Sequence, residues 1–106
     1  ARFHTYLLPS LIVLELVALG ILVTGLFLTY QAYKHAQEER LYEVSQLQRW
    51  EEALAKHDTY PQAYYNAAVH AARLGDSQKA LTYLQKALVL NGNYEPAKEL
   101  KMMLEE

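Results

Sequence analysis

The sequence has no cysteine and contains little that would interrupt a helix. Without cysteine, the chain has neither a disulfide framework nor thiol chemistry. Four glycines and three prolines among 106 residues favour helices joined by short turns. The net charge of −2, with no cluster of Lys and Arg, gives no support for nucleic acid as a partner. At this length the chain holds one small domain besides an apolar segment.

The spacings that catalysis and metal binding require are also lacking. No HExxH motif occurs, no two histidines are paired at the helical spacing of metal ligands, and no glycine-rich loop could cradle a phosphate. No serine has the context of a nucleophile elbow. We therefore predict that the chain is not an enzyme and has no catalytic, cofactor-binding or metal site. The residues considered are His4, His35, His57, His70, Ser10, Ser45 and Ser77.

What the sequence does contain is one long apolar stretch, Leu11 to Leu28, whose single charge is Glu15. The stretch has the length required to span a bilayer. Because neither Pro nor Gly occurs between Leu26 and Tyr60, we expect the helix to continue far beyond the apolar part. A helix from Ser10 to about His57 would be roughly 70 Å long.

The predicted fold is all-α and divides into four parts. Residues 1–9 form an N-terminal arm, since Pro9 suits a first helical turn and makes Pro9 or Ser10 the expected helix start. Residues 10–33 form the apolar, transmembrane-like or filament-core helix. Residues 34–57 form its amphipathic continuation, and residues 58–106 form a helical head. The buried stripe of the continuation comprises Leu41, Val44, Leu47, Trp50 and Leu54.

One face of the apolar helix carries mostly small residues and the one acid. Small residues let helix backbones approach closely, which is how helices associate in apolar surroundings. This face is therefore the predicted assembly interface. The competing interpretation is that Gly and Ala are simply common in membrane spans. Steps of three and four along the helix give the face as Glu15, Ala18, Leu22, Gly25, Thr29, Ala32 and Ala36.

The head carries a recognisable repeat. The 34 residues PQAYYNAAVHAARLGDSQKALTYLQKALVLNGNY resemble a tetratricopeptide repeat (TPR), in which small and aromatic residues recur at fixed offsets. The resemblance implies a helix at Gln62–Leu74, a turn at Gly75-Asp76 and a second helix at Ser77–Asn91. Its packing residues would be Trp50, Tyr64, Ala67, Ala68, Ala71, Gly75, Ala80, Leu84 and Ala87.

The resemblance extends over residues 47–106. Trp50, Ala53 and Leu54 stand 34 residues before Leu84, Ala87 and Leu88, so the end of the long helix is registered like the second helix of a preceding repeat. EPAKELKMMLEE begins another repeat, with Pro96 in a first helical turn. Two positions depart from the family pattern, where Gly92 replaces the usual Pro and Ala68 the usual Gly.

One full repeat and two halves make a short array. Such arrays generally need about three repeats to bury a continuous core, so we expect a neighbouring subunit to cover the exposed faces. The apolar residues of the last helix, which need such cover, are Leu100, Met102, Met103 and Leu104. One repeat also gives almost no groove for a peptide. A peptide or protein partner on the TPR surface would contact Asn66, Arg73, Lys98 and Lys101.

The whole architecture is similar to that of the type IV pilin family. In that family an apolar helix that becomes amphipathic carries a globular head, a leader is cut ahead of the helix, and the helices bundle in the core of a filament. The chain starts at Ala1, and an ordinary secretory signal would take the apolar segment with it, so we expect a short leader or a trimmed chain. The acid near the start of the family's helix pairs with a neighbour's amine.

Carried over to this chain, that role falls to Glu15. Its partner would be a neighbouring amine, Arg2, His4 or a hydroxyl such as Thr24 or Thr29. The departures are the Ala1 start, the deeper position of the acid, the arm with Pro9 and the helical head. We predict a homo-oligomeric, extracellular or cell-surface filament subunit that resides in the membrane before assembly.

The alternative function is that of a single-span, membrane-anchored TPR adaptor, which recruits protein partners to a membrane complex. Single-span anchoring is the commoner use of such a segment. Positive charge is greater after the span than before it, which places the head in the cytoplasm under the positive-inside rule. The residues compared are Lys34, Arg40 and Arg49 after the span and Arg2 before it.

Overall fold

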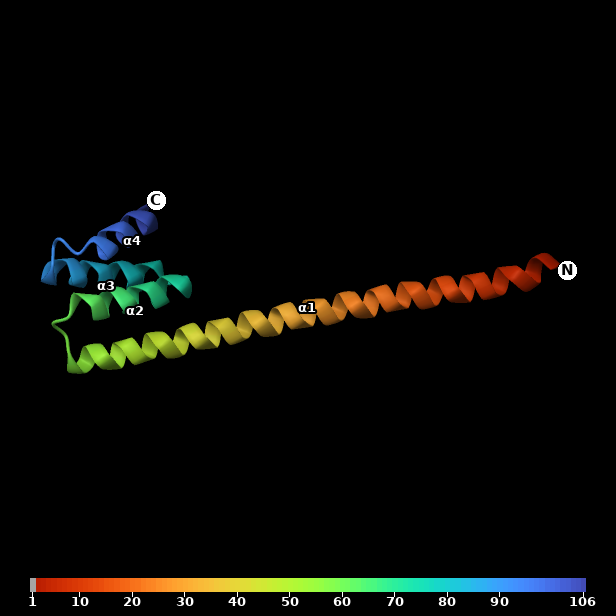
Figure 1. Cartoon of the computed structure of the whole chain (residues 1–106), viewed down its shortest axis with the longest axis horizontal. Helices are drawn as coiled ribbons and strands as arrows, with labels where there is room; N and C mark the ends of the chain where they lie inside the picture. Colours follow the sequence, from red (N-terminus) through yellow and green to blue (C-terminus); the bar gives the residue numbers. More distant parts are fainter. Residues whose placement is uncertain (1) are drawn as a thin grey trace. The chain divides into compact units, whose positions relative to one another are not determined.

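The computed structural model describes the backbone of residues 2–106 and the side chains from Leu8 onward. Over these residues it contains four helices and no strand, which confirms the all-α fold (Figure 1). The chain divides into two compact units, Ala1–Gln37 and Glu38–Glu106. The four helices are α1 (Arg2–Lys56), α2 (Pro61–Arg73), α3 (Ser77–Leu90) and α4 (Glu95–Glu105).

Helix α1 runs through both units and is longer than the sequence indicates. It ends at Lys56, one residue before the expected His57, but it begins at Arg2, so most of the expected arm is helical. Pro9 lies inside the helix instead of opening it. A proline within a helix removes one i→i−4 hydrogen bond, here that to the carbonyl of Thr5. The tendency of Pro to open helices is therefore a poor guide to this helix start.

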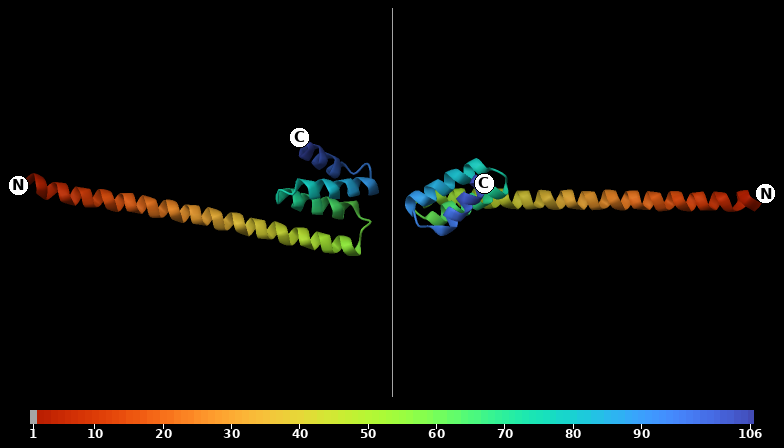
Figure 2. Two further views of the ribbon diagram at one scale, coloured as in Figure 1. Left: turned by 180° about the vertical axis from the view of Figure 1, so that it is seen from behind. Right: turned by 90° about the horizontal axis from the view of Figure 1, so that it is seen from above.

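In the second unit, α2 and α3 form an antiparallel pair joined by a very short turn (Figures 1 and 2). Gly75 adopts a φ of 83°, which residues with a Cβ rarely adopt. The amide of Gly75 donates to the carbonyl of Ala72, and the amide of Asp76 donates to that of Ala71. These two bonds close α2 as a Schellman motif.

Asp76 then opens α3. Its carboxylate Oδ1 accepts a hydrogen bond from the backbone amide of Lys79 at 3.0 Å, and its carbonyl accepts one from the amide of Ala80 at 3.1 Å. One residue thus completes the end of α2 and caps the start of α3. Each residue of the turn between the two helices takes part in ending α2 or in beginning α3.

The core of the second unit consists mainly of alanine. Because alanine side chains are small, the backbones of α2 and α3 approach closely, and Leu84 is the only large side chain among the described residues that is fully buried. Larger, partly buried side chains surround this centre, among them Trp50, Tyr64 and Tyr94. The buried core comprises Leu47, Leu54, Ala63, Ala67, Ala68, Ala71, Ala80, Leu84, Ala87 and Ala97.

Candidate interaction surfaces

The apolar part of α1 is uncovered along its whole length. Every large hydrophobic side chain from Leu11 to Leu28 is about half exposed or more. The helix is long and apolar enough to cross a membrane. A segment of this kind is stable only when lipid or other apolar side chains replace water around it.

The predicted assembly face lies entirely on this exposed surface. Each of its residues is solvent-exposed in the single chain, so none is used for packing within the molecule. The hydroxyl of Thr29 donates to the carbonyl of Gly25 at 2.8 Å, which occupies its only proton. The residues of the face are Glu15, Ala18, Leu22, Gly25, Thr29, Ala32 and Ala36.

A shallow hollow lies beside that face. It is lined by Val17, Gly20, Ile21, Thr24, Gly25 and Leu28, and it shares only Gly25 with the predicted face. No atom outside the helix backbone lies within 4 Å of where a Cβ on Gly20 or Gly25 would stand, so both positions are open. The hydroxyl of Thr24 is folded back onto the carbonyl of Gly20 at 2.8 Å. Steps of three and four counted from Glu15 pass over Gly20 and Thr24, so the predicted face does not include these two residues.

Glu15 has no hydrogen-bond or ion-pair partner among the side chains described, Leu8 to Glu106. Of its proposed partners, the side chains of Arg2 and His4 and the amine of Ala1 lie outside the described residues. Thr24 and Thr29 each donate their one hydroxyl proton to their own helix, so neither has a proton left for a carboxylate. A cationic or amine partner therefore suits Glu15 better than a hydroxyl.

In the second unit the predicted TPR residues lie together. Ala67, Ala68 and Ala71 of α2 are fully buried. They are joined in the core cluster by the fully buried residues of α3, which are Ala80, Leu84 and Ala87. Trp50 and Tyr64 are partly buried against this cluster, and Gly75 forms the turn.

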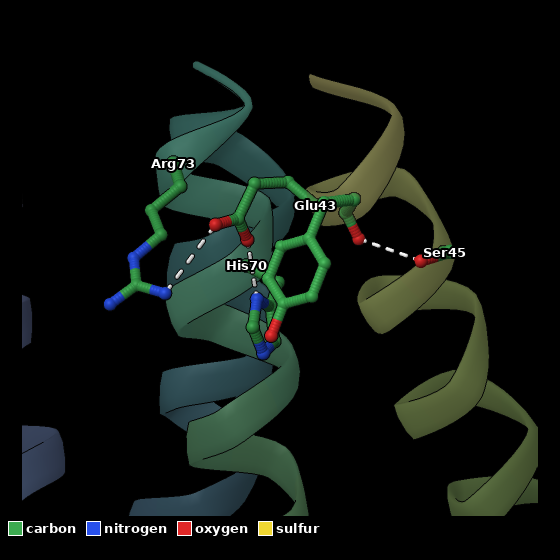
Figure 3. A network of polar contacts seen from close by, with 5 residues as sticks. Glu43, Ser45, His70 and Arg73 are labelled. Carbon is green, nitrogen blue, oxygen red and sulfur yellow. Dashed lines mark hydrogen bonds and ion pairs between the residues drawn. The ribbon is translucent and has the colours of Figure 1, made fainter. Parts of the chain in front are cut away.

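Two polar networks tie the end of α1 to the head, and the sequence indicates neither. Figure 3 shows the first, in which Glu43 of α1 contacts His70 and Arg73 of α2. The distances are 2.5 Å from Glu43 Oε2 to His70 Nδ1 and 3.4 Å from Glu43 Oε1 to an Arg73 guanidinium nitrogen. The side chains of Glu43 and His70 are 15% and 13% exposed, whereas that of Arg73 is 59% exposed. His70 therefore belongs to a largely buried contact between helices.

The second network joins α1 to α3. The hydroxyl of Tyr83 donates to Oε2 of Glu51 at 2.7 Å, and Lys79 Nζ lies 3.6 Å from Oε1 of the same carboxylate. Burial, together with the hydrogen bond to the Glu51 carboxylate, raises the pKa of Tyr83 to about 12. Glu51 thus joins the end of α1 to α3.

Among the described residues, no group of three or more His, Cys, Asp or Glu side chains could hold a metal ion. The second unit is a helical module built on an antiparallel α2–α3 pair, flanked by the end of α1 and by α4. This is the organisation of helical-repeat proteins, which present surfaces to protein partners.

Comparison with known families gives one match. Residues 61–97, which cover α2, α3 and the start of α4, match the family model of the tetratricopeptide repeat. The match supports a TPR protein, and such repeats are generally non-catalytic modules of protein–protein interaction. No curated protein and no solved structure matched the chain. The predicted repeat is thereby confirmed over residues 61–97, and its extension to 47–106 and the pilin-like character of α1 remain predictions.

Proposed function

We propose that the chain is a structural subunit that self-assembles through its apolar helix, which bundles in the core of a pilin-like filament while the TPR heads lie outside. The observation that carries the proposal is the exposure of every large apolar side chain from Leu11 to Leu28. Burial of each Leu, Ile, Val or Phe side chain contributes about 1.5–3 kcal/mol. Packing many such residues against other copies is therefore a strong drive for assembly.

Two features favour neighbouring helices over lipid alone as the surroundings of α1. Gly20 and Gly25 open its surface, and the folded-back hydroxyls of Thr24 and Thr29 leave no unsatisfied donor on it. A second helix can therefore approach the backbone closely. Glu15, in contrast, costs roughly 3 kcal/mol in the middle of a bilayer, and an assembly could supply a cationic partner for it.

The experiment is negative-stain electron microscopy of the purified full chain before and after removal of detergent. The variant Gly25→Leu fills the small-residue surface, and it also raises helix propensity, so it does not act by unfolding the helix. Val23→Leu is the matched control, because Val23 is exposed on another side of the same helix. We expect filaments from the wild type and from Val23→Leu, and none from Gly25→Leu. A chain that stays monomeric after detergent removal contradicts the proposal.

A membrane-anchored TPR adaptor is the second candidate. It is favoured by a specific combination, an apolar helix long enough to cross a bilayer in the same chain as a matched repeat. Under this function the helix meets lipid and the head recruits other proteins. Monodisperse single chains in micelles and in reconstituted vesicles, with no polymer, would support the adaptor over the filament.

A further inference from the structure

A pocket outside the predicted contact residues lies at one end of the TPR unit. The turn between α1 and α2 and the turn between α3 and α4 lie at the same end of the helices (Figure 1). Between them, Trp50, Tyr60, Pro61, Gln62 and Tyr94 line a pocket together with Ala63 and Asn91. None of these lining residues is charged. The pocket is therefore aromatic and neutral.

The aromatic rings of the pocket also make contacts within the protein. The ring of Tyr94 meets that of Tyr65 edge to face, with centroids 5.9 Å apart and an interplanar angle of 85°. The ring of Tyr60 lies 6.0 Å from the His57 ring. Trp50 is partly buried against the core. Rings supported in this way lose little freedom when a ligand stacks on them.

The pocket offers several hydrogen-bond donors, beside acceptors on Gln62 and on the hydroxyls of Tyr60 and Tyr94. Oδ1 of Asn91 already accepts a bond from the backbone amide of Asn93 at 3.1 Å, which leaves the Asn91 NH₂ group to donate. The Trp50 indole can only donate, and the Tyr60 hydroxyl can donate as well. Tyr60 precedes α2 without a side-chain cap, and Pro61 contributes no amide hydrogen. A complementary ligand thus offers carbonyl acceptors and apolar rings, but no charge.

We propose that this pocket binds an extended, proline-rich segment of a protein partner. Proline has no N–H, so a proline-rich segment presents carbonyl acceptors and pyrrolidine rings, and its polyproline II backbone leaves the carbonyls free of internal hydrogen bonds. Aromatic-lined grooves recognise such segments in other folds. An oligosaccharide also stacks on aromatic rings, but no carboxylate lines the pocket to accept bonds from its many hydroxyls. The proposal does not depend on filament formation.

The chain itself provides the probe, because Trp50 is its only tryptophan. The full chain in detergent micelles is titrated with a synthetic peptide containing six consecutive prolines, while Trp50 emission is recorded. A Gly/Ser peptide of equal length and a glucose oligomer serve as comparison ligands. We expect a saturable change in Trp50 emission with the proline peptide and no such change with the two comparison ligands. A response to the glucose oligomer alone, or to none of the ligands, overturns the proposal.

Two variants test whether the pocket is the site. Tyr60→Ala removes a ring that is 60% exposed, and Tyr42→Ala removes one that is 57% exposed and lies outside the pocket. Loss of one aromatic contact should weaken peptide binding roughly three- to tenfold for Tyr60→Ala. Tyr42→Ala should bind like the wild type. Equal affinities in all three proteins would overturn the assignment, and circular dichroism checks that each variant remains folded.

Discussion

Glu43 and His70 are 27 residues apart in sequence, yet their side chains meet between α1 and α2, with Glu43 Oε2 2.5 Å from His70 Nδ1. Both side chains are largely buried, at 15% and 13% exposure. A carboxylate held there needs its partner, since a polar group left unpaired away from water costs free energy. The pair therefore attaches the end of the long helix to the repeat.

We expect Glu43→Gln to lower the free energy of unfolding of the second unit by about 1–2 kcal/mol, because it removes a charge-assisted hydrogen bond. Trp50 fluorescence during urea unfolding measures the change, since the one tryptophan lies in this unit. Glu38→Gln, an exposed acid on the same helix, is the control and should change little. If the two variants are equally stable, the contact does not stabilise the unit.

A double-mutant cycle tests whether the effect of Glu43→Gln comes from the contact of Glu43 with His70. His70→Gln introduced into the Glu43→Gln background should cost clearly less than His70→Gln in the wild type, because the shared interaction is already lost. Strictly additive effects would mean that the two side chains do not interact in solution.

Because the pKa of Tyr83 is raised in the folded chain, we expect the stability of the second unit to fall at alkaline pH. The pKa of Tyr83 in the folded chain is raised from 10.0 to about 12, so folding favours the protonated phenol. A raised pKa contributes stability that is fully present below pH 10 and is lost as the pH rises towards 12. We expect Tyr83→Phe to cost about 1 kcal/mol at pH 8, through loss of the hydrogen bond to Glu51.

The free-energy difference between the wild type and Tyr83→Phe should shrink between pH 8 and pH 11. Urea unfolding at several pH values measures it, and the exposed Tyr42→Phe corrects for the general effect of alkali on the chain. A difference that stays constant over this range would show that the Tyr83–Glu51 contact does not govern the pH response.

Replacing Gly75 with alanine should lower stability much more than the same replacement at Gly92. Gly75→Ala places a Cβ at a φ of 83°, where no neighbour lies within 4 Å, so the expected loss of about 1–2 kcal/mol comes from the backbone conformation alone. Gly92→Ala is the matched control. Its φ is not positive, and its Cβ would make an ordinary 3.8 Å contact with the carbonyl of Leu88.

Thermal unfolding of both glycine variants, followed by Trp50 fluorescence, measures the contrast. Gly92→Ala should be neutral or slightly stabilising, because alanine reduces the freedom of the unfolded chain. A Gly75→Ala variant as stable as the wild type would mean that the turn can form without the left-handed residue.

The helices of the second unit could be predicted closely because strong local signals mark their ends. Pro61, Gly75 and Pro96 each act through their own backbone geometry, and α2, α3 and α4 begin or end beside them. Pro9 carries the same local signal but lies inside α1. A single local preference is small against the propagation of a long helix, so the start of α1 could not be fixed from sequence.

The polar contacts could not be predicted, because they depend on side chains far apart in the chain. Glu51 has the sequence context of a solvated helix face, yet Tyr83, 32 residues later, donates to it. Periodicity tells which side of a helix is apolar, but it does not tell which polar residue at the edge meets a partner on another helix. The hollow at Gly20 and Thr24 escapes prediction for a related reason, because steps of three and four from Glu15 follow a neighbouring face of the helix.

The shared use of Asp76 by α2 and α3 has a consequence for the evolution of this head. Adding one residue between the two helices would separate the roles of closing one and opening the other. Asp76 could then no longer complete both helix ends, so an insertion at this connection is expected to destabilise the α2–α3 pair.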